Sequence, residues 1–322
     1  MIEEAQGILI NNGATLTGSY WHGRIAALGR IASAMYELLY TTGDDEQYGS
    51  SIIYLIYIKE KLLPVFFEAI LDDSLSRRKR INVCAELLSL TRSSGAIGPL
   101  DVPDSVNDKM TELMSTSMIA QTLQAGHDAN LTDKGMHTWY QTLRFALLYL
   151  VQNPSSPQKW KDNVNKTIEA WVDGITPDVA VGRNLNNDRT VSHAPHLCWS
   201  GLSISQALER ITLLSLYEKT TGESLYHDTL LSLYDEYIPV AMESIPYGDE
   251  FDLIERLYAA LNECIRPKEY YQTMKRFGKI LEPRRFRGEV LAETESFKLL
   301  QKSMLIEIEC KTIEAKRSGI SV

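Results

Sequence analysis

Cysteine is scarce in this sequence and is not arranged for metal binding. The four cysteines, Cys84, Cys198, Cys264 and Cys310, are far apart, and no C-x-x-C pair occurs. This spacing excludes the usual zinc-ligand patterns. Each cysteine lies among apolar residues of helical character, so we expect small, buried hydrophobic side chains. Unpaired thiols of this kind favour a reducing compartment.

The sequence also lacks an apolar run long enough to cross a bilayer. A membrane helix needs about 20 apolar residues, and the most apolar stretch, 50–71, is interrupted by Lys59, Glu60, Lys61 and Pro64. The N-terminus is acidic where a secretory signal peptide is basic. We therefore predict no membrane partner and a cytoplasmic location for the chain as written. A secreted protein whose signal peptide had been removed would have the same sequence.

Positive charge is in deficit. The chain has 33 Lys and Arg against 42 Asp and Glu, which gives a net charge of −9. A general nucleic-acid-binding protein needs a basic face to neutralise phosphates, so we predict no nucleic-acid partner. Two basic runs, 77–80 and 284–287, are interpreted as solvated helix ends or loops, with a local binding patch as the alternative.

Strand patterns are nearly absent, whereas helical periodicity runs through most of the chain. Apolar residues such as Ile25, Leu28 and Ile31 recur every three or four positions. Pro64 is expected to kink or break its helix. Helices are predicted at 22–41, 46–71, 76–93, 107–124, 133–152, 157–173, 195–220, 224–243, 249–265, 268–280 and 290–315.

The predicted fold class is all-α, with more than half of the residues helical and at most a short strand or two. We predict a single all-helical domain over 1–322. Gly, Pro, Ser, Asn and Asp gather near 94–106 and 174–194, so these irregular stretches are candidate divisions between subdomains.

Two segments of the chain share a turn pattern. Residues 38–48 read LLYTTGDDEQY and residues 216–226 read LYEKTTGESLY. Gly43 and Gly222 are predicted to end their helices in the left-handed conformation. Tyr48 and Tyr226 are predicted to pack back over each turn, and the short links make the flanking helices antiparallel. Chance similarity in a helix-rich chain is the alternative.

Polar side chains that could take part in catalysis are concentrated in 183–201, which reads RNLNNDRTVSHAPHLCWSG and directly precedes an apolar helix. Pro195 suits the first turn of that helix, which would place His193 and His196 at its N-terminus. The positive end of the helix dipole disfavours a protonated imidazole there, and a neutral imidazole is what a general base requires. In the alternative interpretation, Ser192 caps the helix and both histidines pack locally.

Metal-binding patterns are weak. His193 and His196 form an H-x-x-H pair that would need a third ligand such as Asp188, and no H-E-x-x-H occurs, so we predict no metal and no cofactor. The segment LDDSLS at 71–76 is similar to the aspartate-rich cluster with which helical terpene synthases bind magnesium and diphosphate, but Ser76 occupies the position of the third acid.

The shared turn, Thr-Gly-acidic-x-x-Tyr, resembles the hairpin turn of α/α toroid proteins, which are rings of helical hairpins. Segment 183–201 weakly resembles the alginate lyase family of toroid polysaccharide lyases, whose Asn-Asn-His motif precedes an aromatic residue. Here Asn186 and Asn187 are adjacent, and His193 follows six residues later. The helix beginning at Trp139, WYQTLRFALLYLVQ, is also similar to a tryptophan-started helix of that family. The resemblance implies an incomplete α/α toroid and β-elimination of a uronate-containing polymer.

The resemblance also implies roles for individual residues. Asn187 or Arg189 would offset the uronate carboxylate, His193 would remove the proton, and a tyrosine such as Tyr140 or Tyr247 would protonate the leaving oxygen. An acidic polysaccharide is the expected partner, a non-catalytic helical structural or binding scaffold is the alternative, and the oligomeric state is left open. The residues predicted to contact the substrate are Trp139, Tyr140, His196 and Trp199.

Overall fold

The computed structural model describes most of the chain, and the described part is almost entirely helical. Strand is confined to two dipeptides, so the predicted all-α class is confirmed. None of the described helices is long and apolar enough to cross a membrane. The described residues are 2–13, 21–40, 52–93, 101–116, 119, 133–173, 177–178, 198–199, 204–244, 251–263, 267–281 and 295–320.

Contacts divide the chain into two compact units. Unit 1 combines Met1–Ser115 with Tyr271–Val322, and unit 2 is the continuous stretch Thr116–Tyr270. Unit 1 is therefore assembled from both ends of the chain, and unit 2 is inserted between them.

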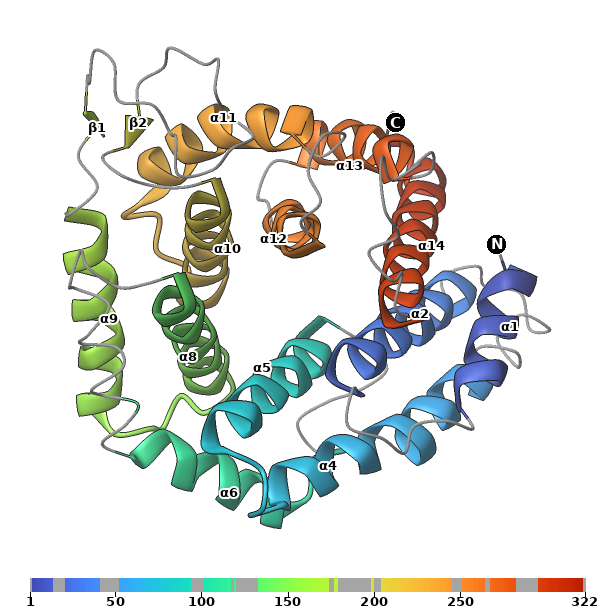
Figure 1. The fold of residues 1–322 in the computed structure, drawn as a ribbon, viewed down its shortest axis with the longest axis horizontal. Helices are drawn as coiled ribbons and strands as arrows, with labels where there is room; N and C mark the ends of the chain where they lie inside the picture. The colour runs from blue at the N-terminus through green and yellow to red at the C-terminus, as the bar shows by residue number, and fades with distance from the viewer. Residues whose placement is uncertain are drawn as a thin grey trace. The chain divides into compact units, whose positions relative to one another are not determined.

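Unit 1 is organised around helix α2. Helix α14 packs along α2, which also contacts α1 and α5, while α4 contacts α5 and α6 (Figure 1). Leu28, Ile31 and Met35 of α2 are fully buried. The first unit contains α1 (Ile2–Gly13), α2 (Trp21–Tyr40), helical residues 52–57, η1 (Ile58–Leu62), α4 (Leu63–Leu71), α5 (Arg77–Ser93), α6 (Asp104–Ser115), most of α13 (Pro267–Leu281) and α14 (Glu295–Arg317).

Pro64 interrupts the α-helical pattern, as predicted. Residues Ile58–Leu62 form a π-helix, and the Leu63 N–H donates to the Ile58 carbonyl. Helix α4 then begins at Leu63 with Pro64 in its first turn. Proline has no N–H to donate, so the regular α-helical hydrogen-bond pattern cannot continue through Pro64. The residues before it form the wider turns of a π-helix, and a new α-helix begins with Pro64 in its first turn, where that N–H is not required.

Unit 2 is organised around α10. This helix contacts α8, α11 and α12, and α9 packs against α8 (Figure 1). Leu208, Ile211 and Leu214 of α10 have no exposed surface, and burial continues along nearly the whole helix. The elements of the second unit are α8 (Asp133–Gln152), α9 (Gln158–Asp173), β1 (Pro177–Asp178), β2 (Cys198–Trp199), α10 (Ile204–Thr221), α11 (His227–Ser244) and α12 (Phe251–Asn262).

The two dipeptide strands correct one sequence prediction. Pro177 pairs with Trp199 and Asp178 with Cys198 in an antiparallel ladder, so the helix predicted to begin at 195 is wrong at 198–199. Helix α10 begins at Ile204. The ladder pairs backbone hydrogen-bonding groups of the extended chain, and aromatic residues such as Trp199 tolerate strand geometry well. The helix-dipole argument for neutral histidines at 193 and 196 therefore no longer applies, because the N-terminus of α10 lies elsewhere.

Two cysteines fit the prediction of inert, buried thiols. Cys84 and Cys310 are both buried and free, and burial raises the pKa of both, that of Cys310 to about 12. Cys198 lies in a strand rather than a helix, and Cys264 lies outside the described residues.

The turn between α10 and α11 has the predicted geometry. Gly222 follows the last residue of α10 with φ 71°, and its N–H donates to the Glu218 carbonyl. Tyr226 is buried, with its ring 5.7 Å from that of Tyr217. The prediction is confirmed for this turn, whereas Gly43 and Tyr48 lie outside the described residues.

We expect Gly222→Ala to lower the free energy of unfolding by about 1 kcal/mol, because a left-handed residue with a Cβ is strained. A Cβ at Gly222 would meet no atom within 4 Å, so the cost is conformational. Gly7→Ala is the matched control, since Gly7 lies inside α1 and its Cβ would also meet nothing. That change should stabilise by roughly 0.5–1 kcal/mol. Urea unfolding of both variants measures the difference, and equal effects would contradict the conformational explanation.

Candidate functional site

Most residues predicted for chemistry lie outside the part of the chain that the structure describes. This holds for Asn187, Arg189, His193, His196 and Tyr247, so their roles stay predictions. Trp199 lies in β2, where its backbone position is fixed by pairing with Pro177.

Two predicted substrate-binding residues are core residues of unit 2. Trp139 is 2% exposed and Tyr140 is 6% exposed, and both belong to α8. A sugar ring stacks on an aromatic face that solvent can reach. Neither ring presents such a face, and both side chains contribute to the apolar packing of α8.

The β1–β2 ladder fixes both ends of the candidate polar segment. Asp178 and Cys198 are paired across the ladder, so residues 179–197 leave and return at the same point of unit 2. The ladder is connected to the C-terminal end of α9 on one side and to the N-terminal end of α10 on the other. The segment with the predicted chemistry is therefore flanked by paired residues and precedes the central helix of unit 2 in the sequence.

A buried ion pair lies in the second turn of α10. Glu209 is 3% exposed, and Arg256 Nε of α12 lies 3.3 Å from its Oε1. The neighbouring Arg210 is desolvated: burial lowers its pKa to about 9, opposed by Tyr237 and Glu209. Sequence reasoning missed this group, although an adjacent glutamate and arginine in the apolar run ISQALERITLLSLY are a signal of buried charge.

Chemically, this group consists of two guanidinium side chains, Arg210 and Arg256, near the carboxylate of Glu209. Guanidinium groups donate paired hydrogen bonds to carboxylates and remain charged near neutral pH. A buried carboxylate such as Glu209 is retained only when a cation compensates for its lost hydration. The arrangement is therefore suited to holding a carboxylate and not to transferring a proton.

The opposite end of α10 is fastened by further polar contacts. His227 Nδ1 lies 3.2 Å from Glu218 Oε2, and the Tyr217 hydroxyl donates to Glu223 Oε2 at 3.0 Å. Burial, followed by the Glu223 contact, raises the pKa of Tyr217, which keeps this hydroxyl protonated. These contacts surround the Gly222 turn. We interpret them as structural contacts that hold the α10–α11 hairpin together, and we call them the α10–α11 clasp.

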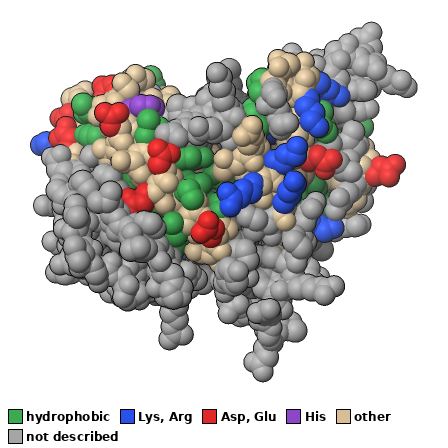
Figure 2. Space-filling model, turned by 90° about the horizontal axis from the view of Figure 1, so that it is seen from above, with side chains coloured by type: hydrophobic (Ala, Val, Ile, Leu, Met, Phe, Trp, Pro, Cys, Tyr) green, Lys and Arg blue, Asp and Glu red, His purple; other side chains and the backbone are tan. Residues whose placement is uncertain are grey.

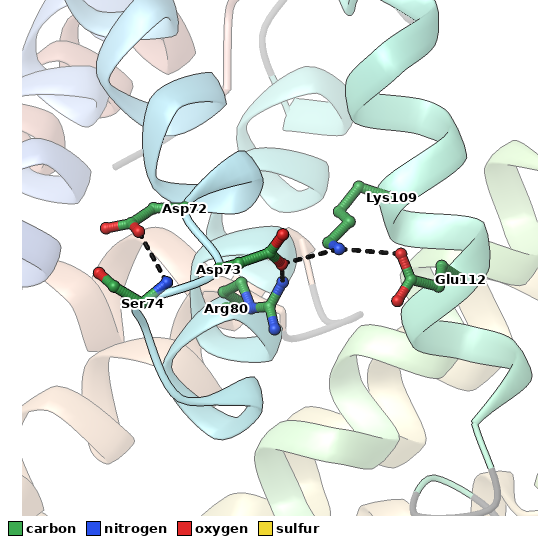
Figure 3. Close-up of polar contacts among 6 residues, drawn as sticks. All are labelled: Asp72, Asp73, Ser74, Arg80, Lys109 and Glu112. Carbon is green, nitrogen blue, oxygen red and sulfur yellow. Dashed lines mark hydrogen bonds and ion pairs between the residues drawn. The ribbon is translucent and has the colours of Figure 1, made fainter.

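The aspartate pair of LDDSLS forms an ion-pair network and not a metal site (Figure 3). Asp73 Oδ1 lies 2.8 Å from Arg80 Nη1 and 2.9 Å from Lys109 Nζ. Lys109 also lies 2.9 Å from Glu112, and the Ser74 N–H donates to Asp72 Oδ1 at 2.8 Å. Within the described ranges, no three His, Cys, Asp or Glu side chains are grouped to hold a metal ion. The similarity to terpene synthases is therefore not supported.

The network also explains the electrostatics of the two aspartates. The hydrogen bond from Ser74 lowers the pKa of Asp72, and Lys109, followed by Arg80, lowers the pKa of Asp73. Arg80 is 7% exposed, so Asp73 compensates a guanidinium that has lost most of its hydration. The network joins the α4–α5 turn to α6.

Comparison with known proteins gives no relative: no family model matches the chain, and no curated protein or solved structure does either. Function therefore has to be argued from the chain's own residues.

The Asp73 network predicts a specific acid sensitivity. Because the folded-state pKa of Asp73 is depressed, its contribution to stability is present above the unfolded-state pKa and is lost as pH falls through the folded-state value. Between about pH 5 and pH 2, the wild type should lose stability more steeply than Asp73→Asn. Thermal unfolding at stepped pH measures the two slopes.

The Lys109→Met background is the control for this prediction. Without the lysine, the effect of Asp73→Asn on the slope should shrink, since Lys109 is the largest cause of the depressed pKa. Identical slopes for wild type and Asp73→Asn would show that the network contributes nothing in acid.

Proposed function

We propose that the helical hairpins of each unit are arranged as in an incomplete α/α toroid. Contacts between every second helix support this proposal. In unit 2, α10 contacts α8 and α12, while α9 and α11 pack against this central set. In unit 1, α2 contacts α14 and α5 in the same manner. Hairpin rings are built in this way, with alternate helices forming an inner and an outer layer.

The packing of α14 against α2 also supports ring closure. These helices lie near opposite ends of the sequence, yet they form the most extensive helix pair of unit 1. A ring of hairpins brings its last inner helix beside its first, whereas an open solenoid keeps its terminal repeats apart.

On this scaffold we propose a polysaccharide lyase-like function, cleaving a uronate-containing polymer by β-elimination. The observation that carries the proposal is the β1–β2 ladder, which pairs Asp178 with Cys198, the two residues that flank the Asn- and His-containing segment. Loops at one end of rigid elements are where folds of this kind carry their chemistry. The desolvated Arg210 and the Glu209–Arg256 pair add guanidinium groups of the kind that bind carboxylates to the same unit.

The proposed reaction assigns one task to each group. Asn187 or Arg189 offsets the carboxylate charge, which makes the proton on the adjacent carbon more acidic. His193 removes that proton; an ordinary imidazole is largely neutral at pH 7 and needs no helix dipole to serve as base. The glycosidic oxygen then leaves with the electron pair, and Tyr247 protonates it. Tyr140, the other tyrosine considered, is buried, so this role goes to Tyr247.

We expect His193→Ala to abolish lyase activity while leaving the melting temperature nearly unchanged. Loss of a general base costs roughly two to four orders of magnitude in rate. The measurement is ultraviolet absorbance of the unsaturated sugar product, with wild type and variant on several uronate polymers. His227→Ala is the matched control, because His227 is assigned to the α10–α11 clasp: it should reduce stability and retain activity. No product from wild type on any polymer would overturn the lyase proposal.

A second candidate, a non-catalytic scaffold, is favoured by one exposed apolar face. Ile52, Ile53 and Ile56 are 39%, 66% and 47% exposed, and their spacing places them on one side of helical residues 52–57. Isoleucine clusters left in solvent mark association surfaces.

If this face serves self-association, Ile53→Glu combined with Ile56→Glu should shift a dimerising protein to monomer without loss of helix. Sedimentation velocity across a concentration series measures the shift. Leu225→Glu is the control, since Leu225 is 69% exposed but lies in the α10–α11 turn. A wild type that is monomeric throughout would remove the support for a self-associating scaffold.

A further inference from the structure

Helix α13 has a basic outer face. Lys275, Arg276 and Lys279 are all exposed, and their positions fall within about a third of the helix circumference. The opposite side is apolar: Met274 is 2% exposed and Phe277 is fully buried. Lysine and arginine side chains gather over part of the surface drawn in Figure 2.

Helix α13 contacts α14 at Gly278. A Cβ at Gly278 would meet Ile308 of α14 at 3.7 Å and Leu305 at 3.9 Å, so the two helices approach closely at this point. The basic face therefore lies on the side of α13 away from its buried residues Met274 and Phe277, at the surface of unit 1.

Within the described residues, Lys275, Arg276 and Lys279 form no ion pair, in contrast to Arg80 and Lys109, which share Asp73. At physiological ionic strength, charges separated by more than about 8 Å are largely screened, so a ligand at this face responds to the local positive charge and not to the acidic remainder.

We propose that this basic face of α13 binds acidic polysaccharide and recruits the polymer for the reaction proposed above; the inference rests on that proposed function for its choice of ligand. Carboxylates repeated along a polymer can each pair with one exposed cation. Lys275 and Lys279 are about 6 Å apart along the helix axis, so successive charges of one chain can engage both. Each contact is weak alone, and their sum gives retention that depends on salt.

Two other polyanions fit the face less well. Single-stranded nucleic acid is held by aromatic side chains interleaved with cations, whereas the one aromatic side chain on the described part of this face, Tyr271, is only partly exposed. A membrane-binding amphipathic helix inserts its apolar side among lipids, but the apolar side of α13 is buried in unit 1 through Met274 and Phe277.

The test compares two neutralised triple variants of the whole protein on immobilised alginate. The triple K275Q/R276Q/K279Q should elute at lower salt than wild type and bind soluble alginate about tenfold more weakly, the combined effect of three exposed charge contacts. R77Q/R78Q/K79Q is the matched control, because it removes the same charge from α5, where none of the three cations forms an ion pair with a described residue. It should elute like wild type. Glutamine is a good helix former, and circular dichroism verifies the fold of both.

Several outcomes would overturn the inference. One is that both triple variants bind alginate equally more weakly than wild type, which indicates diffuse charge. Another is that neither variant binds alginate more weakly. A third is that wild type is retained equally on neutral dextran. Tighter binding to an RNA oligonucleotide or to anionic lipid vesicles, lost in K275Q/R276Q/K279Q, would assign the face to that other polyanion.

The same variants separate this inference from the proposed reaction. Binding that depends on α13, together with no unsaturated product, would uphold the surface and reject the lyase. If wild type forms product and K275Q/R276Q/K279Q is unchanged in alginate binding and in KM for long polymer, the lyase proposal is upheld and the binding surface is rejected. If both proposals hold, the triple variant should have a raised KM on long polymer and an unchanged kcat.

Discussion

The burial of α10 on all sides is the constraint on which the rest of unit 2 depends. An isolated helix with an apolar circumference cannot remain in water, so it must be covered by neighbours on every face. Helices α8, α11 and α12 supply that cover. The buried carboxylates of α10 then need polar partners: Arg256 forms an ion pair with Glu209, and His227 Nδ1 lies at hydrogen-bonding distance from Glu218. Apolar packing and ion pairing are thus two consequences of one central helix.

Charged side chains at the surface are arranged differently from the buried charges of α10. Around Asp73, exposed and buried charges form one network that links the α4–α5 turn to α6. On α13, three cations have no ion-pair partner among the described residues, although the helix is otherwise well packed. Natural sequences usually resolve local electrostatic conflicts unless another requirement maintains them. The contrast between these two surfaces is therefore more informative than the overall charge of the chain.

The sequence predicts elements of this fold better than it predicts contacts. Periodic apolar residues locate α2, α5, α8 and α9 because helix faces repeat along the chain, and the conformation of Gly222 is predictable because few other residues tolerate it. Helix α1 is absent from the predicted helices, although Ala5 and Leu9 are spaced for one buried face.

The candidate site is harder to predict for a physical reason. Strand β2 forms only because a distant dipeptide pairs with it, and Glu209 meets Arg256 only because α10 and α12 are neighbours. The burial of Trp139 and Tyr140 likewise depends on which helices cover α8. Such properties belong to the assembled unit and have no local signature in the residues themselves.

The packing of α14 along α2 has a consequence for how the protein is made. Synthesis proceeds from the N-terminus, so α2 emerges from the ribosome long before α14 exists. Throughout that interval the surface that α14 will cover is open to solvent, while the continuous unit 2 already has all of its own helices. The insert can therefore fold during translation, whereas its host must wait for α14, and the uncovered side of α2 is a natural target for a holding chaperone.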